Sequence, residues 1–253
     1  MDRHAIARAA GLLRAARRVV ALTGAGISRP SGIPDFRSAG GLWTRDDPLA
    51  VASLAGFRAD PRRFYSWVRP LIDTIEVALP NPAHLALAQL EREGRLSAVI
   101  TQNIDGLHKI AGTSEAKLVE LHGSDRLVTC LKCGKTYQPA GVYEKWHEKL
   151  PTPTCDDCGG FLKSANVSFG QSMPVEAMQR AQSWSEQADI FVVIGSSLQV
   201  QPAASFPVIA KRSGALLAIV NRDPTPLDDL ADFVHNGAIG EFFSRLRALS
   251  LDS

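Results

Sequence analysis

The sequence lacks long apolar runs and an excess of charge of either sign, and both absences exclude classes of protein. No apolar stretch in its 253 residues approaches the roughly 20 residues that span a bilayer, so no transmembrane helix is predicted. The 28 Lys and Arg residues against 26 Asp and Glu leave a formal charge of +2, and no block of five like charges occurs. We therefore expect neither a nucleic-acid partner nor a membrane partner.

Internal repeats and low-complexity tracts are also absent, and 253 residues suffice for one main core with an appendage. The N-terminal stretch MDRHAIARAAGLLRAARRVVAL holds several arginines and few acids, which is typical of a transit peptide. Its apolar residues Ile6, Leu12 and Leu13 instead fit a helix that leads directly into a strand. The sequence thus predicts no removable leader and a cytoplasmic protein.

Four short apolar runs have the format of buried strands. RRVVALTGAGIS, LSAVITQNID, ADIFVVIGSSL and GALLAIVNRD are rich in β-branched and aliphatic residues and close on Gly, Ser, Asn or Asp. Helical segments lie between them, including NPAHLALAQLEREG, with Asn81 as N-cap, Pro82 in the first turn and Gly94 as the stop. This alternation predicts an α/β fold with an open, Rossmann-like parallel sheet.

The chain has only four cysteines, and they form two C-x-x-C pairs. Cys130 and Cys133 are followed, after 21 residues, by Cys155 and Cys158. Each pair can aim two thiolates at one point, and two pairs complete the tetrahedral four-sulfur shell that suits zinc. Such a shell has no open position, so the metal is expected to hold its segment together without taking part in chemistry. Two disulfides are the alternative, which the lack of a secretory signal disfavours.

Two segments interrupt the alternation of strands and helices, and both look like insertions. Residues 38–79 are mostly helical in pattern, and residues 123–165 contain all the cysteines. We assign the remaining residues, 1–37, 80–122 and 166–253, to a Rossmann-like nucleotide-binding domain. The helical insertion and the zinc-binding module would together form a smaller domain.

The turn TGAGIS follows the first predicted strand, where a Rossmann-like sheet binds a nucleotide. Gly24 and Gly26 let the backbone approach a pyrophosphate, whose charge the N–H groups of the next helix would face. A hydride-transferring dehydrogenase would have a third glycine in this motif, but Arg29 stands there. The turn thus indicates a nucleotide site without indicating an oxidoreductase.

Three further motifs place polar residues beside predicted strands. SGIPDFR puts Asp35, Phe36 and Arg37 in a loop just beyond the glycine turn. TQNIDGLH ends the second strand with two amides and Asp105, which can recognise a carboxamide or ribose hydroxyls. ELHGS puts His122 just before the cysteine segment. Taken singly, these motifs also fit a rigid surface loop, a helix cap and a packed histidine.

The ordered set of motifs resembles the sirtuins, the NAD-dependent protein-lysine deacylases. The motifs are GAGIS, GIPDFR, TQNID, HG, the two C-x-x-C pairs, GSSLQVQPA at 195–203 and NRD at 221–223. The resemblance covers about residues 11–249. It implies a large Rossmann-like domain and a small zinc-containing domain, with NAD and an acyl-lysine protein substrate meeting in the cleft between them.

The resemblance also implies roles for individual residues. His122 matches the general base, and Asn103 and Asp105 match catalytic positions in the nicotinamide pocket. The implied NAD contacts are Gly24, Ala25, Gly26, Ser28, Ile33, Asp35, Phe36, Arg37, Trp43, Gln102, Asn103, Ile104, Asp105, Gly195, Ser196, Ser197, Asn221, Arg222, Asp223 and Ala238. The implied contacts of the acyl-lysine are Val167, Phe169 and Gly170.

The implied reaction consumes NAD as a co-substrate, with the charged nicotinamide as leaving group and the acyl oxygen attacking the ribose C1′. His122, with an ordinary pKa near 6.5, can accept a ribose hydroxyl proton at neutral pH. The products would be nicotinamide, deacylated lysine and O-acyl-ADP-ribose. A mono-ADP-ribosyltransferase that uses the same NAD site is the alternative activity.

The chain departs from the family pattern at two places that bear on substrate preference. Before the peptide-binding strand it reads KSANVSFGQSMP, with Ser164 in place of Pro and Gln171 in place of Glu. Members that prefer succinyl-lysine carry a Tyr-x-x-Arg pair, but here Tyr65 is followed by Val68, and Arg69 is displaced by one. One residue turns a helical side chain by about 100°, so Arg69 is expected to miss the pocket.

Two other classes of protein are weaker interpretations of the same motifs. A nucleotide sensor would keep the NAD pocket and zinc segment without catalysis, but His122, Asn103 and Asp105 are all present. A zinc-ribbon protein that recognises nucleic acid would have a basic face, but acidic residues dilute the lysines of the cysteine segment.

Overall fold

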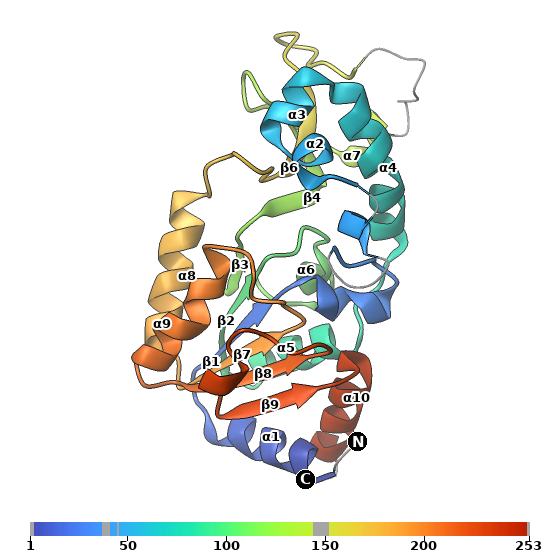
Figure 1. Cartoon of the computed structure of the whole chain (residues 1–253). Helices are drawn as coiled ribbons and strands as arrows, with labels where there is room; N and C mark the ends of the chain where they lie inside the picture. The colour runs from blue at the N-terminus through green and yellow to red at the C-terminus, as the bar shows by residue number, and fades with distance from the viewer. Residues whose placement is uncertain (1–2, 37–40, 45, 144–151, 252–253) are drawn as a thin grey trace.

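The computed structural model describes residues 3–36, 41–44, 46–143 and 152–251, and its largest element is a six-stranded sheet (Figure 1). Its strands, from edge to edge, are β3 (Leu118–Glu120), β2 (Leu96–Thr101), β1 (Val19–Thr23), β7 (Ile190–Ile194), β8 (Leu216–Asn221) and β9 (Phe233–Asn236). Every pairing in this main sheet is parallel. The predicted α/β class with a Rossmann-like parallel sheet is confirmed.

The central strands form because apolar residues fill them on both faces. All residues of β1 and β7 are buried, as expected for strands covered by helices on either side. One face packs against α1 (Arg3–Ala15), α5 (Pro82–Arg92) and α10 (Ile239–Leu251). The other packs against α8 (Val175–Gln187) and α9 (Phe206–Arg212) (Figure 1). Two apolar layers therefore enclose the main sheet.

The winding of the main sheet reverses at β1. The strands β2 and β3 extend from it to one edge, and β7, β8 and β9 extend to the other. Such a switch point opens a crevice at the carboxyl ends of the strands, where α/β sheets bind ligands. The short elements around this sheet are η1 (Ala25–Ser31), η2 (Leu42–Thr44), α6 (Leu107–Ala111), η3 (Ala203–Ser205) and η4 (Asp228–Leu230).

A second, smaller sheet is antiparallel and lies beyond the main sheet (Figure 1). Its strands, in spatial order, are β5 (Thr136–Tyr137), β4 (Gly123–Cys130) and β6 (Leu162–Asn166). The helices of this region are α2 (Pro48–Val51), α3 (Leu54–Ala59), α4 (Pro61–Val77) and α7 (Pro139–Tyr143). A separate apolar cluster joins α3, α4 and α7 to the strands. These elements fall in the two predicted insertions, while the exact domain boundaries stay a prediction.

Most of the predicted elements are present. The four predicted strands are β1, β2, β7 and β8, and α5 begins at Asn81, whose side chain accepts a hydrogen bond from the Ala83 N–H at 3.0 Å. The edge strands β3 and β9 were not predicted, because three and four residues give no periodic signal. The segment after Gly24 is the 3₁₀ helix η1, so the predicted turn from a strand into a helix is present. Within the described residues no helix is long and apolar enough to cross a membrane.

Candidate active site and cysteine centre

Three glycines fix the contact between the loops that follow β1 and β7. The Gly26 N–H donates to the Gly195 carbonyl at 2.8 Å. A Cβ added to Gly24 or Gly26 would lie 2.8 Å from atoms of Gly195, and Gly195 itself has φ +66°. Only glycine tolerates such approaches and such a backbone angle without strain. The glycine turn therefore brings two loops together at the switch point, in addition to its expected role toward a pyrophosphate.

The polar residues after β1 and β2 form one hydrogen-bonded group. The Ser28 hydroxyl donates to Asp105 Oδ2 at 2.7 Å, and Asn103 Nδ2 donates to Ser28 Oγ at 3.2 Å. Asp105 Oδ1 accepts from the Leu107 N–H at 2.9 Å, so the carboxylate also caps α6. All three side chains are buried. The capping role and the site role of Asp105 thus coexist, since each carboxylate oxygen accepts more than one hydrogen bond.

His122 lies between the two sheets, directly before β4. Its Nδ1 is 2.8 Å from the carbonyl oxygen of Gln102. A carbonyl can only accept, so Nδ1 carries the proton and Nε2 is the basic nitrogen of the neutral ring. Burial lowers the pKa of His122 below 6.5, partly opposed by this hydrogen bond, so the ring is neutral at pH 7. The Gln102 amide in turn donates to Ser196 Oγ at 2.8 Å.

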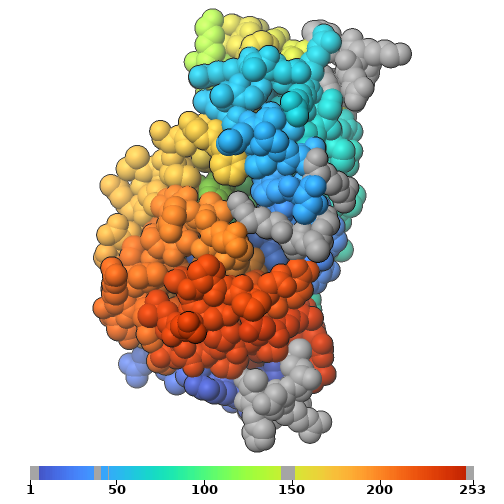
Figure 2. Space-filling model, viewed as in Figure 1, coloured from blue at the N-terminus to red at the C-terminus, as the bar shows by residue number. Residues whose placement is uncertain are grey.

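These residues meet in one cavity of about 500 Å³. Figure 2 shows a hollow between the yellow and orange segments and the blue segment, the parts of the chain that line it. The predicted site residues that line the cavity are Gly24, Ala25, Gly26, Ser28, Ile33, Asp35, Phe36, Trp43, Gln102, Asn103, Ile104, Asp105, His122, Val167, Phe169, Gly170, Gly195, Ser196, Ser197, Asn221 and Asp223. Residues from six separate motifs therefore share one space.

Two predicted NAD contacts among the described residues do not line this cavity. Arg222 is exposed, and its guanidinium donates to the carboxylate of Asp223 at 2.7 Å. Ala238 is exposed before α10 and does not line the cavity. Arg37 lies outside the described residues.

The cavity has an apolar wall that the sequence motifs did not indicate. Trp43 stacks on Phe36 at 4.9 Å and on Trp67 at 5.5 Å between ring centroids. Trp67 lies on α4, and a tryptophan there gives no signal beyond that of an apolar helix face. Further lining residues that were not predicted as contacts include Ala52, Phe64, Leu71, Ile75, Asp125, Asn166, Ser168, Gln171, Met173, Gln199, Val200, Gln201, Pro202 and Pro224.

The side chains of Tyr65 and Arg69 form their hydrogen bonds outside the cavity. The Tyr65 hydroxyl donates to the Leu162 carbonyl at 2.8 Å inside the core of the small sheet. Arg69 Nε donates to Asp73 at 2.8 Å, and its guanidinium also contacts the Tyr143 carbonyl. Neither residue lines the cavity. The structure thus places Arg69 as the one-residue displacement predicts.

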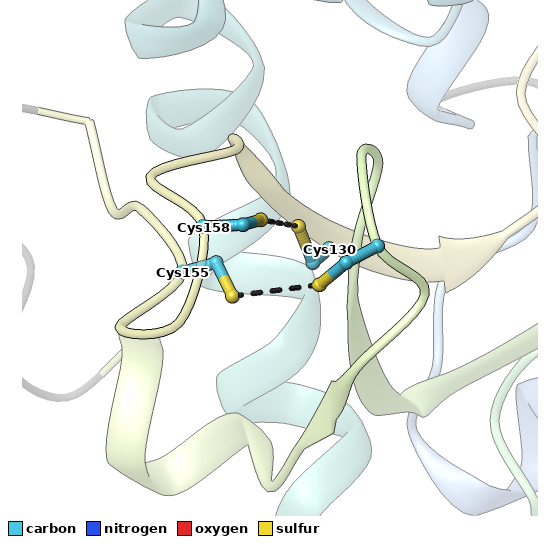
Figure 3. A group of neighbouring side chains, drawn as sticks. Cys130, Cys155 and Cys158 are labelled. Atoms are coloured by element: carbon cyan, nitrogen blue, oxygen red, sulfur yellow. Dashed lines mark hydrogen bonds between the residues drawn. The ribbon is translucent and has the colours of Figure 1, made fainter.

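The four cysteines converge at the end of the small sheet (Figure 3). All four Sγ atoms lie within 4.8 Å of one another, with Cys130 to Cys158 at 3.5 Å and Cys133 to Cys155 at 3.7 Å. Four thiolates about 2.3 Å from a zinc ion would be separated by about 3.8 Å, so the sulfur arrangement fits a tetrahedral zinc. The thiols are free, so the disulfide alternative is wrong.

These observations first define a class of protein. It is an α/β protein with a Rossmann-like sheet, a cluster of four cysteines, and a cavity lined by a histidine, an amide and a carboxylate. Comparison with known proteins then defines the family. The model of the Sir2 family matches residues 24–202, and the chain belongs to this family. The resemblance to the sirtuins is confirmed.

Named relatives and solved structures cover nearly the whole chain. NAD-dependent protein deacetylase 1 of Bradyrhizobium diazoefficiens is 46% identical over 242 residues, which are 94% of each chain. NAD-dependent protein deacylase 2 of Archaeoglobus fulgidus is 43% identical and covers 95% of this chain and 94% of its own. A solved structure described as Sir2 with p53 peptide and NAD⁺ has a TM-score of 0.88 and 41% identity, covering 97% of this chain and 98% of that one.

Proposed function

We propose that this chain is an NAD-dependent protein-lysine deacetylase. The observation that carries the proposal is the environment of His122, whose Nδ1–H is held by the Gln102 carbonyl at 2.8 Å within the cavity that Asn103 and Asp105 also line. A neutral imidazole with a fixed tautomer has the properties of a general base near pH 7. The Sir2 family and the names of the relatives support the same activity.

The residues around the cavity fit NAD as the second substrate. The switch point of the sheet, the glycine contact and the loops of Ser196 and Asn221 fit the dinucleotide, since α/β sheets bind dinucleotides at this place. Asn103, Ile104 and Asp105 would hold the nicotinamide. Val167, Phe169 and Gly170 would line the path of the acyl-lysine. The further predicted NAD contacts Arg37, Arg222 and Ala238 stay predictions.

The chemistry follows from these positions. NAD supplies a positively charged nicotinamide, which is a good leaving group, and the ribose carbon that takes the acyl oxygen. Asp105 and Asn103 orient the carboxamide and keep it away from the reacting face. His122 accepts the proton of a ribose hydroxyl, which allows that hydroxyl to take over the acyl group. One water is consumed, and the products are nicotinamide, the lysine amine and O-acetyl-ADP-ribose.

The remaining predictions belong to the same proposal. The partners are acyl-lysine proteins, with no nucleic acid among them. Zinc holds the small sheet in place and takes no part in the chemistry, because its four thiolates leave no open position. The cytoplasmic location stays a prediction from the sequence. The two insertions form the small domain, whose side of the cavity carries the acyl-lysine.

The test is mass spectrometry of an acetyl-lysine peptide incubated with the protein, with and without NAD. We expect loss of the acetyl group only with NAD, together with O-acetyl-ADP-ribose. His122→Ala should reduce the rate by about 100-fold to 10,000-fold, the usual contribution of a general base. His235→Gln is the control, because His235 packs against Phe242 and does not line the cavity.

Each other outcome has a meaning. Transfer of labelled ADP-ribose to protein without loss of the acetyl group would replace the proposal by the ADP-ribosyltransferase. An unchanged rate in His122→Ala would remove the base from the mechanism. The chain has Val68 where members that prefer succinyl-lysine have Arg, so we expect little activity on a succinyl-lysine peptide. A rate on that peptide equal to the rate on acetyl-lysine would contradict this prediction.

A further inference from the structure

The inner end of the cavity contains a buried polar group that the reaction does not use. Asp125 lies on β4, three residues after His122, and Asn166 ends β6 directly before Val167. Both line the cavity that contains His122 and Val167. The ribbons of β4 and β6 lie above the main sheet, with α4 to their right (Figure 1). The polar group therefore adjoins the path that the acyl-lysine would take.

Asp125 uses only one of its two carboxylate oxygens. Oδ1 accepts from Asn166 Nδ2 at 2.7 Å and is also in hydrogen-bond contact with the Ser164 hydroxyl. Oδ2 is buried and has no hydrogen-bond partner within the described residues. The residue is 2% exposed. A buried polar atom without a partner costs about 1–3 kcal/mol, so a ligand that supplies the missing hydrogen bond recovers that free energy.

Lys163, which is 1% exposed, does not supply that partner. Its ammonium group donates to the Ser164 carbonyl at 3.0 Å and to the carbonyl and side-chain oxygens of Asn166, both at 2.8 Å. These contacts use all three donors of a lysine. Lys163 is therefore a second buried charge near Asp125, but it donates no hydrogen bond to Asp125 Oδ2.

The neighbouring wall is apolar. Phe64, Trp67, Leu71 and Ile75 of α4 line the same cavity as Asp125. Such a wall accommodates the methylene groups of an acyl chain longer than acetyl. Apolar side chains of α4 and the carboxyl-bearing residue Asp125 therefore line the same cavity.

The Asp125 carboxyl disfavours an acyl group that carries its own carboxylate. Burial raises the pKa of the Asp125 carboxyl, and the hydrogen bonds from Ser164 and Asn166 oppose that rise. Where the carboxyl is ionised it repels a second carboxylate. Burial lowers the pKa of Lys163 to about 8, so its ammonium group is charged at pH 7 and compensates the charge of an ionised Asp125. A neutral hydroxyl avoids that repulsion, and it can donate to the ionised carboxyl or accept from the protonated one.

We infer that the inner end of this cavity selects lysine acyl groups that carry a hydroxyl beyond the carbonyl carbon, with Asp125 Oδ2 as the hydrogen-bond partner. The inference rests on the proposed deacylase function and names its substrate class. Ser164 and Asn166 hold the Asp125 carboxylate in place, so they act as positioning residues.

The experiment compares matched acyl-lysine peptides that differ by hydroxyl against methyl, which have similar volume. One pair is 3-hydroxybutanoyl and 3-methylbutanoyl, and the other is 4-hydroxypentanoyl and 4-methylpentanoyl, with acetyl as the reference. For the wild type we expect kcat/KM to favour the hydroxyl member of at least one pair about tenfold, since a buried hydrogen bond to a carboxylate is worth at least that ratio. Preference for the methyl member in both pairs overturns the inference.

Variants assign the preference to Asp125. In Asp125→Leu the hydroxyl-to-methyl ratio should fall to about one or below, and Asp125→Asn should retain part of the preference because its amide still forms hydrogen bonds. Asp229→Leu, at an exposed aspartate of η4, is the matched control and should keep the wild-type ratio. An unchanged ratio in Asp125→Leu overturns the inference. If Asp125→Leu does not fold, the test rests on the other two proteins: the wild type should prefer the hydroxyl member, and Asp125→Asn should show a smaller preference. An unchanged ratio in Asp125→Asn would then overturn the inference.

The two proposals fail differently. Removal of acetyl with NAD, but no hydroxyl preference, leaves the deacetylase in place and removes the selectivity. No removal of any acyl group removes the proposed function, and the inference with it.

Discussion

The two sheets of this protein enclose one cavity but are stabilised in different ways. The main sheet has β1 and β7 buried on both faces by helices whose apolar residues form two continuous clusters. The small sheet has an apolar core rich in aromatic residues, which also contains Cys130 and Cys155. The charged residues Asp125 and Lys163 are buried in the same region. The first region gains its stability chiefly from apolar burial, whereas the second also depends on the chemistry of its cysteines.

This difference assigns separate tasks to the two walls of the cavity. The loops that follow strands of the main sheet carry the contact between Gly26 and Gly195. They also carry the hydrogen-bonded group of Ser28, Asn103 and Asp105. The small sheet carries Asn166 and, at its start, adjoins His122. Loss of order in the small sheet should therefore remove the acyl-lysine side of the site while leaving the nucleotide side folded.

The largest expected effect is that of metal removal. Treatment with a strong zinc chelator, or Cys130→Ser, should lower deacetylation more than about 100-fold, because structural zinc binding supplies folding free energy. Hydrogen exchange should lose protection in β4 and β6 and keep it in β1 and β7. Lys132→Ala, between the two ligands of one pair, is the control. Equal loss of protection in both sheets would show that the regions are one cooperative unit.

Deleting one core ring in each region compares them directly. Phe57 and Phe191 are both fully buried, the first in the small region and the second in the main sheet. Each change to Ala should cost about 3–5 kcal/mol of local stability. Phe191→Ala should lower the free energy of global unfolding in urea. Phe57→Ala should instead raise exchange in α3, α4 and β4, and an equal global loss for both variants would contradict the comparison.

Acid should weaken the main-sheet region through a buried histidine pair. His84 and His108 lie 4.9 Å apart between ring centroids, and burial lowers the pKa of His84 to about 4, opposed by the nearby Asp105 charge. Unfolded His84 takes up a proton near pH 6.5, whereas the folded protein does so only near pH 4. This contribution to stability is therefore fully present above pH 6.5 and is lost progressively as the pH falls from 6.5 to 4. Between pH 7 and pH 5 this loss is roughly 2 kcal/mol.

Urea unfolding of wild type and His84→Gln at both pH values measures that loss. The variant should show a smaller decrease in unfolding free energy on acidification, because its side chain does not titrate. Any zinc release at pH 5 affects both proteins and cancels in the difference. Parallel pH dependences would show that His84 does not contribute.

The smallest expected effect concerns the link between the regions. Arg126 on β4 donates to the Asp105 carbonyl at 2.6 Å and to the Ile75 carbonyl at 3.0 Å. Arg126→Ala removes both hydrogen bonds and should lower the free energy of unfolding by about 1–2 kcal/mol. The KM for NAD should rise more than kcat changes, since the proposed function gives Asp105 the nicotinamide as its partner. Arg62→Ala, an exposed arginine of α4, should do neither.

Much of the fold and site could be predicted because its signals are local. The strands β1, β2, β7 and β8 consist of apolar runs, and the turn at Gly24 and the two C-x-x-C pairs are short motifs. The strands β3 and β9 could not be predicted, because three or four residues become strands only by pairing with a neighbour.

The polar inner end of the cavity could not be predicted for a related reason. Asp125, Lys163 and Asn166 were not among the predicted site residues, and Ser164 was noted only as a departure from the family pattern. They become buried partners because β4 and β6 pair antiparallel, with Ser164 opposite Val128 and Asn166 opposite Gly123. A contact across about 40 residues of sequence has no local signature.

The sequence by itself determined the α/β class, the glycine turn, the four zinc-fitting cysteines and the residues that mark the Sir2 family, because each depends on neighbouring residues in the chain. The tertiary structure alone decided that His122 has a fixed tautomer, that Trp43 stacks on Trp67, and that one oxygen of Asp125 is left without a partner. These properties depend on burial and on distances between remote segments, and only the folded chain sets them.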